Sequence, residues 1–135
     1  MTIIAGAFAI SLAACGSAVA AGAIAFGSTG DIAKDGYSIG FAAGSASDEE
    51  ARDSAIRACR SNGAKQSQDQ CEVLIVFHKQ CTAEAQDPKA GTPGFGFAVA
   101  ENEDSAKSLA MAICAATAGK NRRKSCTIIT SRCDE

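Results

Sequence analysis

Six of the seven cysteines follow a repeated spacing, and no other feature limits the possible folds as strongly. Cys59 and Cys71 lie 12 positions apart, and Cys114 and Cys126 repeat that interval 55 residues later (71 − 59 = 126 − 114 = 12; 114 − 59 = 55). An even set of cysteines at repeated spacing is typical of small exported domains held together by disulfides. The spacing therefore predicts such a domain, and it predicts no particular activity.

The N-terminal segment predicts export. Residues 2–14 are apolar or small, which matches the hydrophobic region of a signal peptide and is too short to span a bilayer. Ala18-Val19-Ala20 supplies the small residues of a cleavage site, so we expect residues 1–20 to be a signal peptide removed before Ala21. No Lys or Arg precedes the hydrophobic run, and a retained N-terminal helix or strand is the alternative.

A second processing route is equally visible. Leu12-Ala13-Ala14-Cys15 resembles a lipobox, in which residues 1–14 form a lipoprotein signal and Cys15 is acylated. Either route leaves six cysteines in the mature domain, an even number that fits an oxidising compartment. We therefore expect a periplasmic or secreted protein, or alternatively a lipoprotein anchored to the membrane.

The balance of charges argues against two classes of partner. The chain has 13 basic and 15 acidic residues, which gives a net charge of −2. Such a balance does not favour electrostatic capture of nucleic acid or of an anionic membrane. We expect a monomer with no nucleic-acid partner, whose membrane contact depends on a lipid at Cys15.

The chain reads as two similar halves, about residues 21–78 and 81–133. Segment 39–43 (IGFAA) aligns with 95–99 (FGFAV), segment 22–25 (GAIA) aligns with 82–85 (TAEA), and the two cysteine pairs align with each other. A half of about 50 residues is near the smallest size that folds alone. We therefore expect residues 21–135 to form a single domain with one shared core.

Each half has the same order of predicted elements. Two strands joined by a turn with Gly, Asp or Pro come first, at 22–27 and 37–43 and again at 82–85 and 94–100. A helix follows, and a return strand rich in β-branched residues ends each half, at 71–77 and 126–130. This duplicated ββαβ unit predicts an α+β fold, with two helices packed on one face of a mostly antiparallel sheet.

The two helices have clear start and stop signals. Ser47 and Glu50 have the spacing of a capping box, and Asn102 is the expected N-cap of the second helix. Asn62-Gly63 and Gly119 are expected to end the helices. The apolar stripes expected to face the sheet are Ala51, Ala55, Ile56 and Cys59 in the first helix and Ala106, Leu109, Ala110, Ile113 and Cys114 in the second.

These positions suggest how the cysteines pair. Cys59 lies on the buried face of the first helix and Cys71 opens the strand that follows, so a bridge between them would join helix to sheet. The repeat then pairs Cys114 with Cys126 and leaves Cys81 for Cys133. Other connectivities are possible, and this one rests on the repeat and on local closure. A bridge across so short a loop contributes about 2–4 kcal/mol.

Motifs for metals and cofactors are missing from the sequence. Structural zinc sites favour ligands two to four residues apart, and the cysteines have no such spacing. The sequence also lacks a C-x-x-C pair, a dinucleotide fingerprint and a phosphate loop. We therefore expect no bound metal and no cofactor.

His78 is the single histidine and the main candidate for catalysis. No motif supplies it with a nucleophile or a carboxylate partner. The equivalent position in the second half is Cys133 (78 + 55 = 133), so histidine is not part of the repeated design. We favour a structural role for His78 and expect no catalytic residue.

Residues 120–124 (KNRRK) form the one concentrated charge run, in the loop between Cys114 and Cys126. A solvated loop is the favoured interpretation, because a few charges rarely suffice for specific binding. The functional interpretation is contact with an anionic ligand or a partner protein. The residues concerned are Lys120, Arg122, Arg123 and Lys124.

Ordered small residues and cysteines resemble those of a known family. They are 22–26 (GAIAF), 37–40 (YSIG), Ala58-Cys59, Cys71-Glu72-Val73 and Cys81-Thr82-Ala83, with 94–100, Cys114, Cys126 and Cys133 in the second half. On these residues the chain resembles the bacterial exported domain of unknown function 4189 over nearly all of its mature length. The family pattern usually has Trp at the position of Ala21 and a hydrophobic residue at that of Glu84. The resemblance implies export and a compact α+β domain without an established catalytic site.

Together these observations favour a small exported domain that works by binding. We expect an unidentified protein partner, such as an envelope enzyme or a toxin that the domain inhibits. Two alternatives remain open: a hydrolytic enzyme of the cell envelope that uses His78, and a structural lipoprotein tethered through Cys15.

Overall fold

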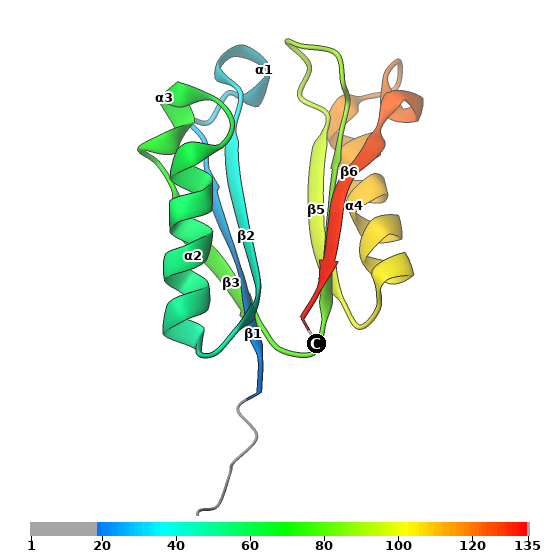
Figure 1. The fold of residues 1–135 in the computed structure, drawn as a ribbon. Helices are drawn as coiled ribbons and strands as arrows, with labels where there is room; N and C mark the ends of the chain where they lie inside the picture. Colours follow the sequence, from blue (N-terminus) through cyan, green and yellow to red (C-terminus); the bar gives the residue numbers. More distant parts are fainter. Residues whose placement is uncertain (1–18, 135) are drawn as a thin grey trace, which may run out of the picture.

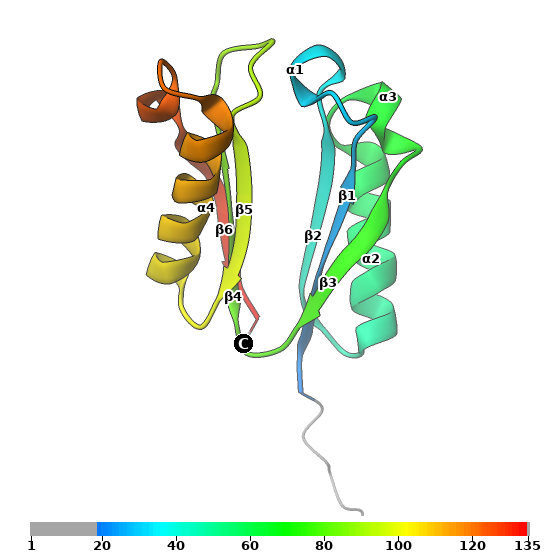
Figure 2. The same ribbon diagram turned by 180° about the vertical axis from the view of Figure 1, so that it is seen from behind.

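The computed structural model describes residues 19–134, which form four layers in the order helix, sheet, sheet, helix. The two sheets face each other at the centre, and a long helix covers the outer face of each (Figure 1). The view from behind shows the same arrangement, with the C-terminus near the start of β4 (Figure 2).

Each half of the chain builds one three-stranded antiparallel sheet and one outer helix. The first half has strand order β2-β1-β3 and the second has β5-β4-β6. The elements of the first half are β1 (Ala21–Gly27), α1 (Ile32–Asp35), β2 (Ser38–Ser45), α2 (Asp48–Ser61), α3 (Lys65–Gln68) and β3 (Glu72–Phe77). Those of the second half are β4 (Cys81–Gln86), β5 (Phe95–Ala100), α4 (Glu103–Ala118), the 3₁₀ turn η1 (Arg123–Ser125) and β6 (Thr127–Cys133).

The α+β class, the duplicated unit and the antiparallel pairing are as the sequence predicts. The strands form two sheets, however, where one sheet with both helices on one face was expected. The difference lies in the pairing of each return strand. β3 pairs with β1 and β6 pairs with β4, so each return strand completes a three-stranded sheet within its own half. Among the described residues no strand of one half pairs with a strand of the other, and the halves associate through the apolar inner faces of the two sheets.

Each helix packs very closely on its sheet. On the helix side of β1, Ala21, Ala23 and Ala25 are fully buried against α2, and Ala83 and Ala85 of β4 are buried in the equivalent cluster under α4. A Cβ atom added at Gly40 would collide with the carbonyl oxygen of Ala55 in α2. The contact is repeated at Gly96, where it would collide with that of Ala110 in α4. Small residues are required on both sides of these interfaces.

This close approach explains one difference from the expected apolar stripe. Ala106, Ala110 and Cys114 are fully buried, as predicted, but Leu109 and Ile113 remain 49% and 44% exposed. With the α4 backbone so near the sheet, only alanine and cysteine fit beneath it, and the larger side chains lie at its sides. The helix-side cores are correspondingly small.

The larger apolar side chains gather between the two sheets. Ile24, Ile39, Phe77 and Phe95 are buried there and draw on both halves. The ring of Phe95 lies 5.4 Å from that of Phe26 and 4.0 Å from that of Tyr37, measured between centroids. Aromatic burial of this kind is the main contact that holds the sheets face to face.

Three disulfides join these layers. Cys59–Cys71 and Cys114–Cys126 connect each outer helix to the start of the return strand, with Cα–Cα distances of 6.0 and 6.1 Å. Cys81–Cys133 links directly opposed residues of β4 and β6. This is the pairing expected from the repeat. Of the helices that the structure describes, none has the length and apolarity needed to cross a bilayer.

The close helix–sheet contact leads to a test by substitution. Gly40→Ala places a methyl group against the α2 backbone, and we expect it to lower the free energy of unfolding by about 3 kcal/mol or more, at the upper end of overpacking effects. Gly30→Ala is the control: its φ is +103° but no atom lies within 4 Å, so only the backbone cost of about 1–2 kcal/mol applies. Chemical denaturation measures both, and equal losses would contradict the packing account.

Candidate functional site

The strand register defines which residues of the two halves are equivalent. Ile24 faces Ile75 and Ala25 faces Val73, so Leu74 lies in a bulge of β3. In the second half Glu84 faces Thr130 and Ala85 faces Ile128, which leaves Ile129 in a bulge of β6. The two bulges are 55 positions apart (129 − 74 = 55), the same offset as the cysteine pairs. The duplication therefore extends to single residues.

The inner faces of the two sheets differ in polarity at these equivalent positions. Four apolar residues of the first half correspond to polar or charged residues in the second. The pairs are Ile24 with Glu84, Phe26 with Gln86, Ile75 with Thr130, and Phe77 with Arg132. Gly22 and Thr82 form a fifth pair of equivalent positions. A Cβ atom at Gly22 would collide with the ring of Phe77, which lies opposite it. Thr82 lies opposite Arg132 instead, and there a side chain is accommodated.

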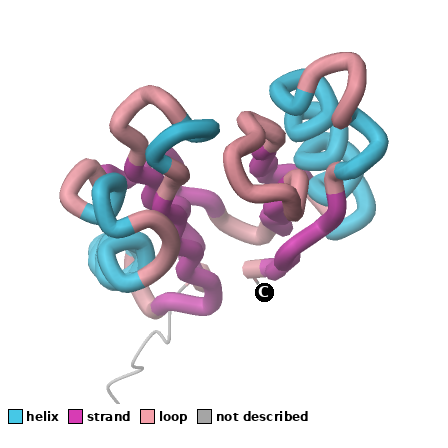
Figure 3. The backbone as a smooth tube through the Cα atoms, turned by 90° about the horizontal axis from the view of Figure 1, so that it is seen from above, coloured by secondary structure: helices cyan, strands magenta, loops and turns pink. Residues whose placement is uncertain are grey.

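A cleft of about 690 Å³ lies between the two sheets. It is lined by the polar residues of the first four pairs, which are Glu84, Gln86, Thr130 and Arg132. Tyr37, Ile39 and Phe41 form the opposing apolar wall on the β2 side. α1 and the loop between β4 and β5 border the cleft at one end, where they lie beside each other in the view from above (Figure 3). A cleft of this volume with a few convergent polar groups is typical of ligand sites in proteins.

Glu84 is the deepest charged residue in the cleft. It is 6% exposed, and its Oε1 accepts a hydrogen bond of 2.8 Å from the hydroxyl of Tyr37. Burial raises the pKa of Glu84, and the hydrogen bond from Tyr37 offsets part of that rise. Burial and the neighbouring carboxylate also raise the pKa of Tyr37. The bond joins the two halves across the cleft.

The cleft also contains exposed cations. Lys34, Lys89 and Arg132 all line the cleft, and all three side chains are exposed to solvent. Asp35 also lines it and accepts a hydrogen bond of 2.7 Å from the hydroxyl of Thr29. The cleft therefore combines an apolar wall, a buried carboxyl group and a cationic rim.

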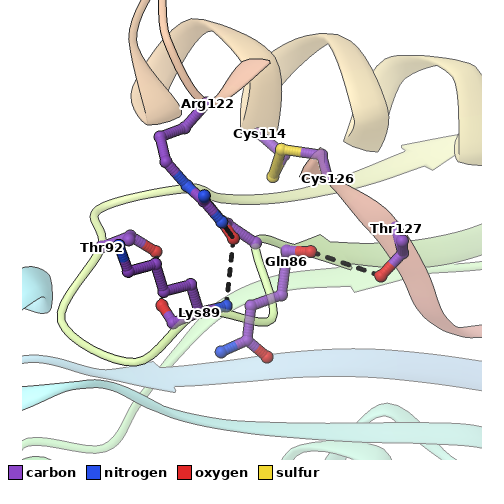
Figure 4. A network of polar contacts seen from close by, with 8 residues as sticks. Gln86, Lys89, Thr92, Cys114, Arg122, Cys126 and Thr127 are labelled. Carbon is purple, nitrogen blue, oxygen red and sulfur yellow. Dashed lines mark hydrogen bonds and ion pairs between the residues drawn. A yellow bond between two sulfur atoms is a disulfide. The ribbon is translucent and has the colours of Figure 1, made fainter. Parts of the chain in front are cut away.

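The basic loop contains one residue with a structural role. Arg122 donates from Nε and Nη2 to the two carboxylate oxygens of Asp87, at 2.7 and 2.6 Å. Figure 4 shows Arg122 reaching toward the loop that carries Lys89 and Thr92. The Arg122 hydrogen bond holds the pKa of Asp87 at about 2. Arg122 is thus engaged within the fold, while Lys120, Arg123 and Lys124 lie exposed around η1.

His78 is fixed by two polar contacts. Its Nε2 lies 3.1 Å from a carboxylate oxygen of Asp48 at the start of α2, and its Nδ1 lies 3.1 Å from the carbonyl oxygen of Ala20. Neither contact is with a nucleophile, and His78 does not line the cleft.

The remaining expected sites are placed as follows. The six cysteines of the domain form the three bridges, and Cys15 lies outside the described residues. Within residues 19–134, no three His, Cys, Asp or Glu side chains are grouped closely enough to hold a metal ion.

The comparison with protein families agrees with the resemblance noted in the sequence. Residues 21–133 match the model described as Domain of unknown function (DUF4189). The chain belongs to this family. The match spans both halves of the fold, from the first residue of β1 to the last of β6. No curated protein and no solved structure matches the chain.

The cleft residues were not found by motif reasoning. In the sequence Glu84 is marked only as a departure from the family pattern, and Tyr37 only as part of the segment 37–40 that carries the resemblance. Gln86, Thr130 and Arg132 belong to no motif. The internal repeat contained the missing signal, since aligning 22–26 with 82–86 sets Ile24 beside Glu84. Positions that are apolar in the first half and polar or charged in the second identify the inner face of the second sheet as the one that differs.

The raised pKa of Glu84 leads to a prediction about stability and pH. A carboxyl group whose pKa is higher in the folded state than in the unfolded state costs stability where it is ionised. Glu84→Gln keeps an acceptor for Tyr37 and removes the charge, so we expect an equal or higher free energy of unfolding at pH 7. The difference from wild type should shrink as the pH falls and Glu84 takes up a proton.

Denaturant titrations at pH 7 and pH 5 measure this effect. Glu101→Gln is the matched control, because Glu101 is exposed and outside the cleft, and its substitution should change nothing. A clear loss of stability in Glu84→Gln at pH 7 would show that the carboxylate supports the fold.

The Arg122–Asp87 pair leads to a second prediction. Arg122→Ala leaves the buried Asp87 carboxylate without a counter-charge. We therefore expect the Arg122→Ala variant to have a melting temperature well below that of the Arg123→Ala variant. Because the pKa of Asp87 is lowered from 3.8 to about 2, its contribution is present above pH 3.8 and is lost as the pH falls toward 2. Thermal melts from pH 5 to pH 2 test this, and equal melting temperatures for the two variants would contradict it.

Proposed function

We propose that this chain is an exported binding domain without catalytic activity of its own, and that the cleft between its sheets receives a segment of a partner protein. The observation that carries the proposal is the polarity of the inner face of the second sheet. Four positions that are apolar in one half are polar or charged in the other, and all four line the cleft.

Energetics support a binding role for this face. Apolar residues at these positions would bury more surface between the sheets, so polar residues there forgo part of the available stabilisation. Residues that reduce stability and line a cleft are typical of functional sites. An envelope enzyme or toxin that the domain inhibits is the kind of partner we favour.

Export rests on the disulfides and on the N-terminal segment. Three bridges form and persist in oxidising compartments. Processing before Ala21 would leave the whole of β1 in the mature domain, since that strand begins at Ala21. A lipid on Cys15 would tether the same domain to a membrane surface.

A catalytic role for His78 has less support. Its Nε2 already contacts Asp48, and it lies outside the cleft. Its contact with the Ala20 carbonyl would be lost on processing before Ala21. The contact with Asp48 favours a role in fixing the start of α2 against the end of β3.

Partner capture from envelope extracts, compared across matched variants, tests the proposal. Arg132→Glu reverses an exposed charge in the cleft, and Arg123→Glu reverses one in the basic loop. We expect the partner retained by wild type to be lost with Arg132→Glu and kept with Arg123→Glu. The opposite pattern would move the contact to the basic loop. Hydrolytic turnover by the pure protein, with no partner captured, would overturn the binding role.

A further inference from the structure

We propose that Glu84 is a cation site, which receives the ammonium group of an extended peptide segment lying in the cleft. The inference rests on the proposed function and adds the chemistry of the segment. Lysine side chains and free chain N-termini both carry such a group, and the experiment below separates these two sources.

The first argument is the incomplete pairing of the Glu84 carboxyl group. Tyr37 donates to Oε1, and no other hydrogen bond or ion pair within residues 19–134 engages the carboxylate. A buried carboxylate that lacks a counter-charge is unfavourable. A ligand ammonium would supply both the charge and hydrogen-bond donors for Oε2.

The second argument is the depth of the charges. Glu84 is 6% exposed, whereas Lys34, Lys89 and Arg132 are solvent-exposed at the rim. Water and salt screen exposed charges much more strongly than buried ones. Glu84 is therefore the least screened charge that lines the cleft, and the exposed cations would attract acidic groups that flank the ammonium.

The third argument is the shape and lining of the cleft. The strand orders make β2 and β6 edge strands, and both contribute lining residues. Edge strands present backbone donors and acceptors that an extended chain can pair with. Ile39, Phe41 and Ile129 add apolar surface suited to the methylene groups of a lysine side chain.

The test uses the purified, disulfide-bonded protein and four short peptides, followed by amide chemical shifts in an NMR titration. The peptides are Ac-Ala-Lys-Ala-NH₂, Ala-Ala-Ala-NH₂ with a free N-terminus, neutral Ac-Ala-Ala-Ala-NH₂ and acidic Ac-Ala-Glu-Ala-NH₂. We expect at least one ammonium peptide to shift cleft residues and to bind about tenfold or more tightly than the neutral one. Preference for the first or the second peptide identifies the source as a side chain or a chain terminus.

Two variants make the result specific to the carboxylate. Glu84→Gln keeps the size of the side chain and should abolish the preference for ammonium peptides, whereas Glu101→Gln should keep it. The proposal is overturned if no ammonium peptide shifts the cleft, if the neutral or acidic peptide binds equally well, or if Glu84→Gln retains the preference. A partner still lost with Arg132→Glu would then leave the binding role intact while removing this account of its chemistry.

Discussion

The close contact of each helix with its sheet is the constraint on which the rest of the structure depends. Gly40 and Gly96 allow the helix backbones to approach so closely that the buried residues of the helix-side cores are all alanine and cysteine. Cys59–Cys71 and Cys114–Cys126 hold these interfaces covalently. Because cores of small residues bury little apolar area, the large side chains must be buried elsewhere. The inner faces of the sheets take that role, and the two halves associate through them.

The inner faces are then used in two ways. Phe26, Tyr37, Phe95 and Phe97 form an aromatic contact that holds the sheets together. On the part of the interface formed by β4 and β6, polar and charged residues replace the apolar set of the first half and line a cleft. A duplicated fold permits this division, since one copy supplies an apolar face while the other acquires polar groups. Tyr37 belongs to both parts of the interface, because its ring joins the aromatic contact and its hydroxyl donates to Glu84 in the cleft.

Local signals in the sequence predicted local structure well. The caps at Ser47 and Asn102 and the helix ends at Asn62 and Gly119 lie where expected, because each depends on a few neighbouring residues. The choice of two sheets over one was not predictable, since it depends on which distant strands pair. Leu109 was misplaced because helical periodicity does not encode how closely a helix approaches its sheet. Glu84 and Arg132 were readable only by comparing the halves position by position.

The central claim is that the polar inner face of the second half is kept for binding at some cost in stability. The most direct test is the free energy of unfolding of a variant that carries the first half's inner face. Its substitutions are Thr82→Gly, Glu84→Ile, Gln86→Phe, Thr130→Ile and Arg132→Phe, with Tyr37→Phe to remove the hydroxyl that loses its acceptor. The account predicts a free energy of unfolding equal to or above that of wild type. A substantially lower value would contradict it, because the polar residues would then be required by the fold itself.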